Sequence, residues 1–215
     1  HIAGGEPFFM KKELLMLLNA INNKSKVTVR ILTNVSVYDT DIIEKLKEFQ
    51  KVNLMLSIDA VGRHIEISRW KSNWKVLETN IQRFKKDNFN LIMVPAISLY
   101  TVSSLPDLLE YCTMNEIYSD ILFIQDPVHQ VVNMIPANNL KIIKEEIIQK
   151  YLGNLISEKY VNYKEIIQQL NFYIEKNHVK EETIKAFWKW QDYFEKNRNY
   201  SLKKELPHVY DAIKK

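Results

Sequence analysis

The chain has 215 residues, of which 46% are hydrophobic and 26% are charged, and its net charge is +4. These values are typical of a folded protein with a sizeable core and exclude a disordered chain. The positive charge is spread along the chain with no basic block longer than a pair, so we expect neither nucleic acid nor an anionic membrane as a partner. No apolar run approaches the roughly 20 residues that span a bilayer.

The first informative segment is Gly4-Gly5-Glu6-Pro7, which follows the short apolar stretch His1–Ala3. We interpret it as a strand end and a tight turn that opens a helix over 11–23, because glycine permits turn conformations and proline suits a first helical turn. A strand end, a carboxylate and a helix N-terminus can together hold a zwitterionic or anionic ligand. The alternative is an ordinary strand-to-helix loop. Since only half a strand precedes the turn, we expect that the beginning of the protein is missing.

Strands and helices alternate along the next hundred residues. Strands are predicted over 26–33, 52–59, 89–99 and 121–125, and helices over 40–49, 74–86 and 105–114. Asp39 is the expected cap of the first of these helices, and Pro95 is expected to interrupt the strand in which it lies. This alternation predicts parallel βαβ units with right-handed crossovers.

Beyond Pro127 the pattern becomes helical, over 138–157, 160–177 and 180–197. We therefore divide the chain into an α/β core over 1–135 and a helical extension over 136–215. The aromatic cluster around Trp188 and Trp190 is expected to pack this extension onto the core rather than to bind a ligand.

Cys112 is the only cysteine. It cannot form an intramolecular disulfide, which agrees with a reducing, cytoplasmic compartment. Nor can one thiol hold an iron–sulfur cluster, which needs three or four. Its place in the apolar part of the helix over 105–114 favours a small buried hydrophobe over a reactive thiol.

Polar residues follow every predicted strand, where ligands gather in parallel βα folds. Each alone is more often a helix cap or turn residue, but together they predict a ligand site on one rim. Ser57 and Asp59, two residues apart, are expected to face the same way. The residues of this rim are Gly4, Gly5, Glu6, Thr33, Asn34, Ser57, Asp59, Ser98, Gln125 and Asp126.

The order of these motifs resembles that in radical S-adenosylmethionine (radical SAM) enzymes. Gly-Gly-Glu-Pro comes first, then Thr33-Asn34, then Ser57-Ile58-Asp59-Ala60. The stretch 57–81 is similar to members with SPASM or twitch extensions. In those members a Glu and an Arg follow, and then an apolar or Trp position opens the next helix; here Glu66, Arg69 and Trp74 occupy those places. The segment 187–205 is similar to the end of twitch-type members.

The resemblance implies a partial (β/α)6 TIM-like barrel, here lacking its first βα unit, with a mostly helical C-terminal tail. It also implies an enzyme that cleaves S-adenosylmethionine reductively at a [4Fe–4S] cluster and abstracts hydrogen from a peptide or small-molecule substrate, with an electron donor as partner. The CxxxCxxC cluster motif of the family would lie upstream of His1, so the chain as given would be inactive. No catalytic residue or metal ligand is expected within it.

The resemblance also suggests roles for the rim residues. Gly4, Gly5 and Glu6 match the motif that receives the amino group of S-adenosylmethionine. Ser57 matches a position near the ribose or carboxylate, and Asp59 is expected either to accept from ribose hydroxyls or to order the loop. Arg69 is a candidate partner of the ligand carboxylate, and the alternative is a surface pair with Glu66. Contacts to the nucleoside or the substrate are looser expectations for Asn34, Ser98 and Gln125.

Two other functions stay open. The chain could be a non-catalytic α/β binding module that has lost the cluster. It could also be a fragment of an unrelated (β/α) barrel whose rim binds a phosphorylated metabolite. The sequence does not define the substrate.

Overall fold

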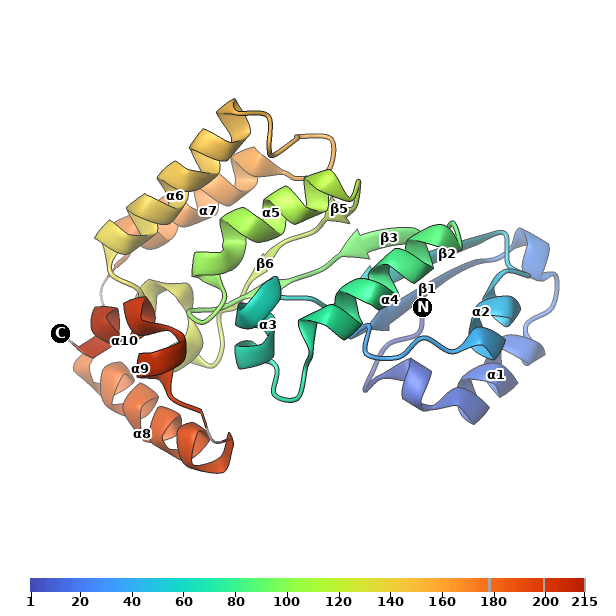
Figure 1. Ribbon diagram of the computed structural model, residues 1–215, viewed down its shortest axis with the longest axis horizontal. Coiled ribbons are helices and arrows are strands. Elements are labelled where there is room, and N and C mark those ends of the chain that lie inside the picture. Colours follow the sequence, from blue (N-terminus) through green and yellow to red (C-terminus); the bar gives the residue numbers. More distant parts are fainter. Residues whose placement is uncertain (178, 199, 215) are drawn as a thin grey trace.

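The computed structural model describes residues 1–177, 179–198 and 200–214 and has an α/β fold with a parallel sheet at its centre (Figure 1). The strands pair in the order β1-β2-β3-β5, and every pairing is parallel. Their bounds are β1 (Thr28–Thr33), β2 (Lys51–Leu56), β3 (Asn90–Met93) and β5 (Tyr118–Ser119). Sequential strands are therefore neighbours in space, as the βαβ interpretation predicts.

The two longest strands show why the sequence forms a sheet here. In β1, Val29, Ile31 and Thr33 are buried while the intervening residues are more exposed, which is the period-two pattern of a strand with one face on the core. β2 lies between β1 and β3 and is buried along most of its length, as expected for a central parallel strand.

Pro95 interrupts the third strand, as predicted. The chain leaves the main sheet after β3, and β4 (Ala96–Ile97) pairs with β6 (Leu122–Phe123) in a second parallel sheet. Proline has no N–H to donate to a ladder, so a break at this position is the expected result. β5 falls outside the strand predicted over 121–125.

Helices connect the strands and cover the sheet. Asp39 caps α2 through its carboxylate, which accepts from Asp41 N at 3.0 Å and Ile42 N at 3.2 Å. The helices are α1 (Lys11–Ala20), α2 (Thr40–Leu46), α3 (Gly62–Ser68), α4 (Trp74–Lys86) and α5 (Leu105–Met114). The bounds of α4 and α5 are those predicted. No helix is predicted at α3, where the burial of Ile65 and Ile67 holds a short one.

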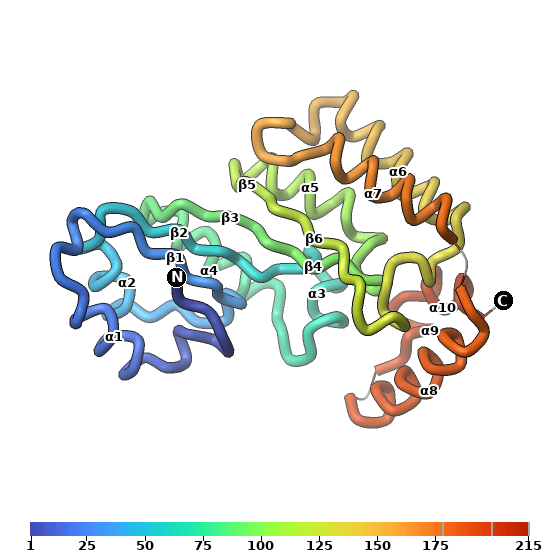
Figure 2. Tube along the Cα trace, turned by 180° about the vertical axis from the view of Figure 1, so that it is seen from behind, coloured from blue at the N-terminus to red at the C-terminus, as the bar shows by residue number. Residues whose placement is uncertain are grey.

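The C-terminal third is helical, as predicted, and its helices form two groups. α6 (Ala137–Leu152) and α7 (Tyr163–Glu175) lie side by side, and α8 (Glu181–Arg198) lies with two further helices at the end of the molecule remote from α1 (Figures 1 and 2). Those two are α9 (Leu202–Glu205) and α10 (Pro207–Lys214). One-turn 3-10 helices occur at η1 (Pro7–Phe9), η2 (Lys24–Lys26), η3 (Val102–Ser104), η4 (Val128–Gln130) and η5 (Val132–Met134).

The helical extension is joined to the sheet by backbone as well as by side chains. Val161 forms a parallel bridge with Ser119, whose N–H donates to Tyr160 O at 2.8 Å. The ring centre of Tyr100 lies 6.1 Å from that of Trp190 and 6.3 Å from that of Phe187. The aromatic cluster therefore does pack α8 onto the α/β part. The division into domains near residue 135 stays a prediction.

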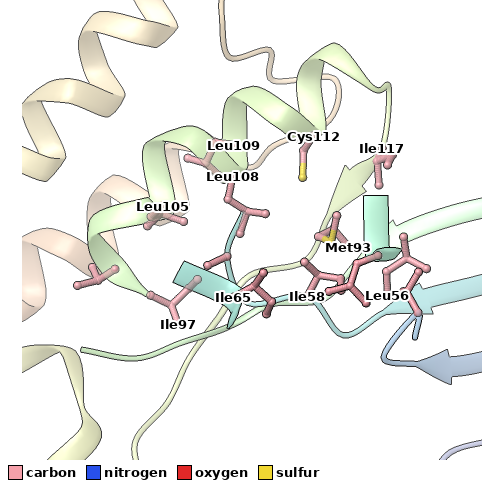
Figure 3. Packing of buried hydrophobic residues seen from close by; sticks show 14 of the residues in the cluster. Leu56, Ile58, Ile65, Met93, Ile97, Leu105, Leu108, Leu109, Cys112 and Ile117 are labelled. Atoms are coloured by element: carbon pink, nitrogen blue, oxygen red, sulfur yellow. The ribbon is translucent and has the colours of Figure 1, made fainter. Parts of the chain in front are cut away.

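The core between α5 and the strands contains Cys112 (Figure 3). The apolar face of α5 lies over Met93 and Ile97, and Cys112 is fully buried within it. Burial raises the pKa of the Cys112 thiol to about 12, so this side chain is a small hydrophobe, as expected. Among the described residues, no helix combines the length and apolarity needed to cross a membrane.

Candidate ligand site at the carboxyl ends of the strands

The N-terminal segment lies beside β1. Ile2 N donates to Arg30 O at 2.8 Å, and Leu32 N donates to Ile2 O at 3.0 Å, so this segment extends the sheet in parallel. The turn that follows has φ of +106° at Gly4 and +57° at Gly5, both in the region that favours glycine. Both glycines are exposed, and no main-chain N–H of another described residue donates to their carbonyl oxygens.

The Glu6 carboxylate is buried and joins this turn to the end of β1. It accepts from Phe8 N at 3.1 Å, from Thr33 Oγ1 at 2.8 Å and from Asn34 N at 2.5 Å. The first contact caps η1, in which Pro7 takes the first position. Proline therefore opens a separate 3-10 turn before α1. Since Glu6 is engaged within the protein, the exposed acceptors of this motif are the main-chain carbonyls of its glycines.

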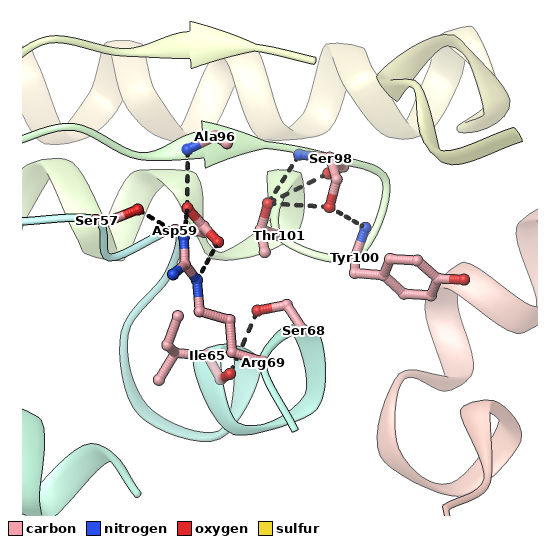
Figure 4. A network of polar contacts seen from close by, with 9 residues as sticks. All are labelled: Ser57, Asp59, Ile65, Ser68, Arg69, Ala96, Ser98, Tyr100 and Thr101. Atoms are coloured by element: carbon pink, nitrogen blue, oxygen red, sulfur yellow. Dashed lines mark hydrogen bonds and ion pairs between the residues drawn. The ribbon is translucent and has the colours of Figure 1, made fainter. Parts of the chain in front are cut away.

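Ser57, Asp59 and Arg69 form one polar network at the end of β2 (Figure 4). Arg69 pairs with Asp59 in two places, Nε to Oδ2 at 2.7 Å and Nη2 to Oδ1 at 3.0 Å. Arg69 Nη2 also donates to Ser57 Oγ at 2.8 Å. Ala96 N donates to Asp59 Oδ1 at 2.9 Å, which ties the end of β2 to β4. As predicted from their spacing, Ser57 and Asp59 face the same partner.

The alternative surface pair between Arg69 and Glu66 does not form. Glu66 instead pairs with Arg63 at 2.9 Å and accepts from Trp74 N at 3.0 Å, at the start of α4. The bond from Trp74 N, with the pairing to Arg63, lowers the pKa of Glu66. Glu66 and Trp74 thus stabilise the connection between α3 and α4.

Asn34 and Arg69 line one cavity of about 510 Å³. Asn34 Oδ1 accepts from Ser36 N at 2.9 Å and from Ser36 Oγ at 2.5 Å, which fixes the loop after β1. Trp70 and Lys71, which follow α3, also line this cavity. Neither residue is predicted from the sequence, because only the folded position of their loop brings them beside Asn34.

Ser98 and Gln125 are not brought into the same network. Ser98 is buried in its own turn, where its N–H donates to Thr101 Oγ1 at 2.9 Å and its hydroxyl accepts from Tyr100 N at 3.2 Å. Gln125 is exposed after β6 and makes no hydrogen bond with another described residue. The predicted rim is therefore joined from Ile2 to the start of β4, and Ser98 and Gln125 are not part of it.

No metal centre is formed by the described residues, which contain no group of three or more histidine, cysteine or acidic side chains able to hold an ion. Comparison of the chain with protein-family models, with curated proteins and with solved structures finds no match. The geometry of the rim and the order of its motifs therefore carry the functional argument.

Proposed function

We propose that this chain is the C-terminal portion of a radical SAM enzyme, and that the rim formed by Gly4, Gly5, Ser57, Asp59 and Arg69 holds S-adenosylmethionine. The observation that carries the proposal is the Ser57–Asp59–Arg69 network at the carboxyl edge of a parallel sheet. This network joins three residues that the family resemblance assigns to one ligand.

The donors and acceptors of the rim fit the polar groups of S-adenosylmethionine. Its ammonium group needs acceptors, which the exposed carbonyls of Gly4 and Gly5 supply. Its carboxylate needs a cation with planar donors, and Arg69 has its Nη1 group left over after pairing with Asp59. Asp59 holds the guanidinium in place, so Arg69 is oriented before the ligand arrives.

The described residues do not fit the iron–sulfur cluster. Cys112, the single thiol, is buried on the inner face of α5, so we derive no step of the reaction from this chain. In the proposal the cluster ligands lie upstream of His1. The cluster would supply the electron that cleaves S-adenosylmethionine, and the electron would come from a separate donor. The substrate would be a peptide or a small molecule.

The topology supports a partial (β/α)6 barrel as the fold of the whole enzyme. Ile2, β1, β2, β3 and β5 are adjacent in chain order, and helices make the crossovers between them. One further βα unit before Ile2, as the resemblance implies, would add a strand at the free edge of this segment. A cytoplasmic location is part of the proposal, since such clusters need a reducing compartment.

The test uses the natural full-length protein. We expect the coding region upstream of His1 to encode a CxxxCxxC loop, and the anaerobically reconstituted protein to release 5′-deoxyadenosine from S-adenosylmethionine with a reductant. Arg69→Ala should weaken S-adenosylmethionine binding by about tenfold or more, whereas Arg30→Ala, at an exposed arginine of β1, should not. A natural protein without the three cysteines would exclude the radical mechanism and favour the non-catalytic module.

A further inference from the structure

A second, smaller cavity of about 210 Å³ lies where the loop after α3 meets the end of α8 and the residues that follow it. It shares Trp70, Lys71 and Ser72 with the cavity that contains Asn34 and Arg69, so the two are adjacent. Phe194 and Arg198 of α8 form its other side. The helical extension thus reaches the neighbourhood of the proposed S-adenosylmethionine site here.

Arg198 is held by aromatic rings and has free donors. Its guanidinium carbon lies 3.8 Å from the ring centre of Phe194 and 5.5 Å from that of Trp70. No described residue accepts a hydrogen bond from it or forms an ion pair with it. Burial lowers the pKa of Arg198, because the cation loses part of its hydration there without gaining a counter-ion. The guanidinium thus lies over the Phe194 ring, and its N–H groups are left for a planar acceptor.

Arg63, in the same cavity, shows the opposite arrangement. It donates to both oxygens of Glu205, at 3.0 and 2.9 Å, and to Glu66 at 2.9 Å. The two carboxylates of the cavity are therefore already engaged by one arginine. What remains is Arg198 together with Lys71, whose Nζ lies 4.5 Å above the ring of Trp70 and has no ion-pair partner among the described residues.

Two cations that both lie close to the Trp70 ring, without counter-ions among the described residues, favour an anionic ligand. The cavity volume suits a side-chain-sized group and is too small for a nucleotide. A planar guanidinium fixed by stacking is best matched by a carboxylate, which accepts two parallel N–H bonds. Trp70 is 53% exposed and can cover the apolar stem of such a group.

We propose that the cavity between Trp70 and Arg198 binds a carboxylate group of the substrate, with Arg198 as its main partner and Lys71 as the second cation. Identifying the ligand as the substrate rests on the proposed function, whereas the binding of a carboxylate does not. An acidic side chain of a peptide and a free dicarboxylic acid offer the same chemistry.

The experiment is calorimetric titration of the natural protein with three probes. These are a capped Gly-Glu-Gly peptide, the matched Gly-Gln-Gly peptide, and glutarate. We expect the Glu peptide or glutarate to bind saturably and about tenfold or more tightly than the Gln peptide. Binding of the Glu peptide identifies a peptide as the source of the carboxylate, and binding of glutarate alone identifies a free acid. Equal binding of the Glu and Gln peptides without glutarate binding, or no saturable binding at all, would overturn the proposal.

Variants locate the site. Arg198→Met, which removes the charge but keeps an unbranched side chain, should weaken carboxylate binding by about tenfold or more, and Arg198→Lys should recover only part of it. Lys196→Met, at an exposed cation on the same helix, is the matched control and should bind as the unmodified protein does. Equal affinity in Arg198→Met and Lys196→Met would overturn the assignment. Binding of S-adenosylmethionine should not change in Arg198→Met, which separates this proposal from the proposed function.

Discussion

The carboxyl ends of the strands are used differently in two regions: a first half formed by Ile2, β1 and β2 of the main sheet, and a second half formed by β4 and β6 of the small sheet. At Ile2, β1 and β2, side chains bond across neighbouring strand ends, through Glu6 in one case and Asp59 in the other. At β4 and β6, Ser98 bonds only within its own turn and Gln125 is exposed. The first half is therefore a fixed frame of charged and polar side chains, which reaches the second half only at the main chain of Ala96.

This difference indicates where a small polar ligand would be held and where a variable one would meet the protein. Fixed groups suit recognition of a constant ligand, because they lose little freedom on binding. The open second half and the cavity at Arg198 suit a substrate. Glu6 and Asp59 are both buried carboxylates of the frame, so their removal tests it most strongly.

The largest effect is expected for Glu6→Ala. Three donors, Phe8 N, Thr33 Oγ1 and Asn34 N, would lose a buried acceptor, and the free energy of unfolding should fall by about 3 kcal/mol. Urea denaturation measures this loss of unfolding free energy. Gln125→Ala, in the other half, should change stability by less than about 0.5 kcal/mol. Similar losses in the two variants would remove the contrast between the halves.

A smaller effect is expected for Asp59→Asn. The amide can still accept from Ala96 N, but Arg69 would lose its ionic partner in a half-buried position, at a cost of about 2 kcal/mol. The matched control is Asp120→Asn, an exposed carboxylate near β5. If thermal or urea unfolding gave the same stability for both variants, the network at β2 would be no part of the frame.

The smallest expected effect is a pH dependence of stability at α3, the helix that precedes Arg69. His64 of α3 and His208 of α10 both lie against Ser103 Oγ, at 3.4 and 2.8 Å from their Nε2 atoms. Burial lowers the pKa of both imidazoles, and His208 lowers that of His64 further, while Asp107 opposes this. Because the unfolded chain then binds protons more readily, stability should be present above about pH 6.5 and decrease as the pH falls below it.

Unfolding measured between pH 7.5 and 5 checks this dependence. His208→Gln should flatten the profile relative to the unmodified protein. His129→Gln would be a poor control because its Nε2 is buried without a partner among the described residues, so the exposed His1→Gln serves instead. If the stability of His208→Gln depended on pH as steeply as that of the unmodified protein, protonation of His208 would not be the cause of the dependence.

The sequence predicted what depends on local pattern. α4 and α5 have the predicted bounds because their periodicity is strong and Asn73 and Pro106 mark their starts. α3 was missed because seven residues carry too little periodicity. β5 was missed because its two residues are defined by pairing with Ile92 and Met93 of β3 and with Val161. Such short elements are determined by tertiary contacts that no local pattern records.

The same division holds for the site. Ser57, Asp59 and Arg69 lie within 12 residues of one another, so their spacing could indicate a common ligand. The internal use of Glu6 could not be predicted, because Thr33 and Asn34 follow it by 27 and 28 residues. Arg198 comes close to Trp70 only through the packing of the helical extension. No local sequence pattern therefore predicts the cavity that these two residues line.

The most direct test compares S-adenosylmethionine binding by two arginine variants of the natural full-length protein, measured by equilibrium dialysis under anaerobic conditions. Arg69→Ala should lose about tenfold or more in affinity, and Arg198→Met should bind as the unmodified protein does. Retained affinity in Arg69→Ala, or no saturable binding by the folded unmodified protein, would contradict the assignment of this rim to S-adenosylmethionine.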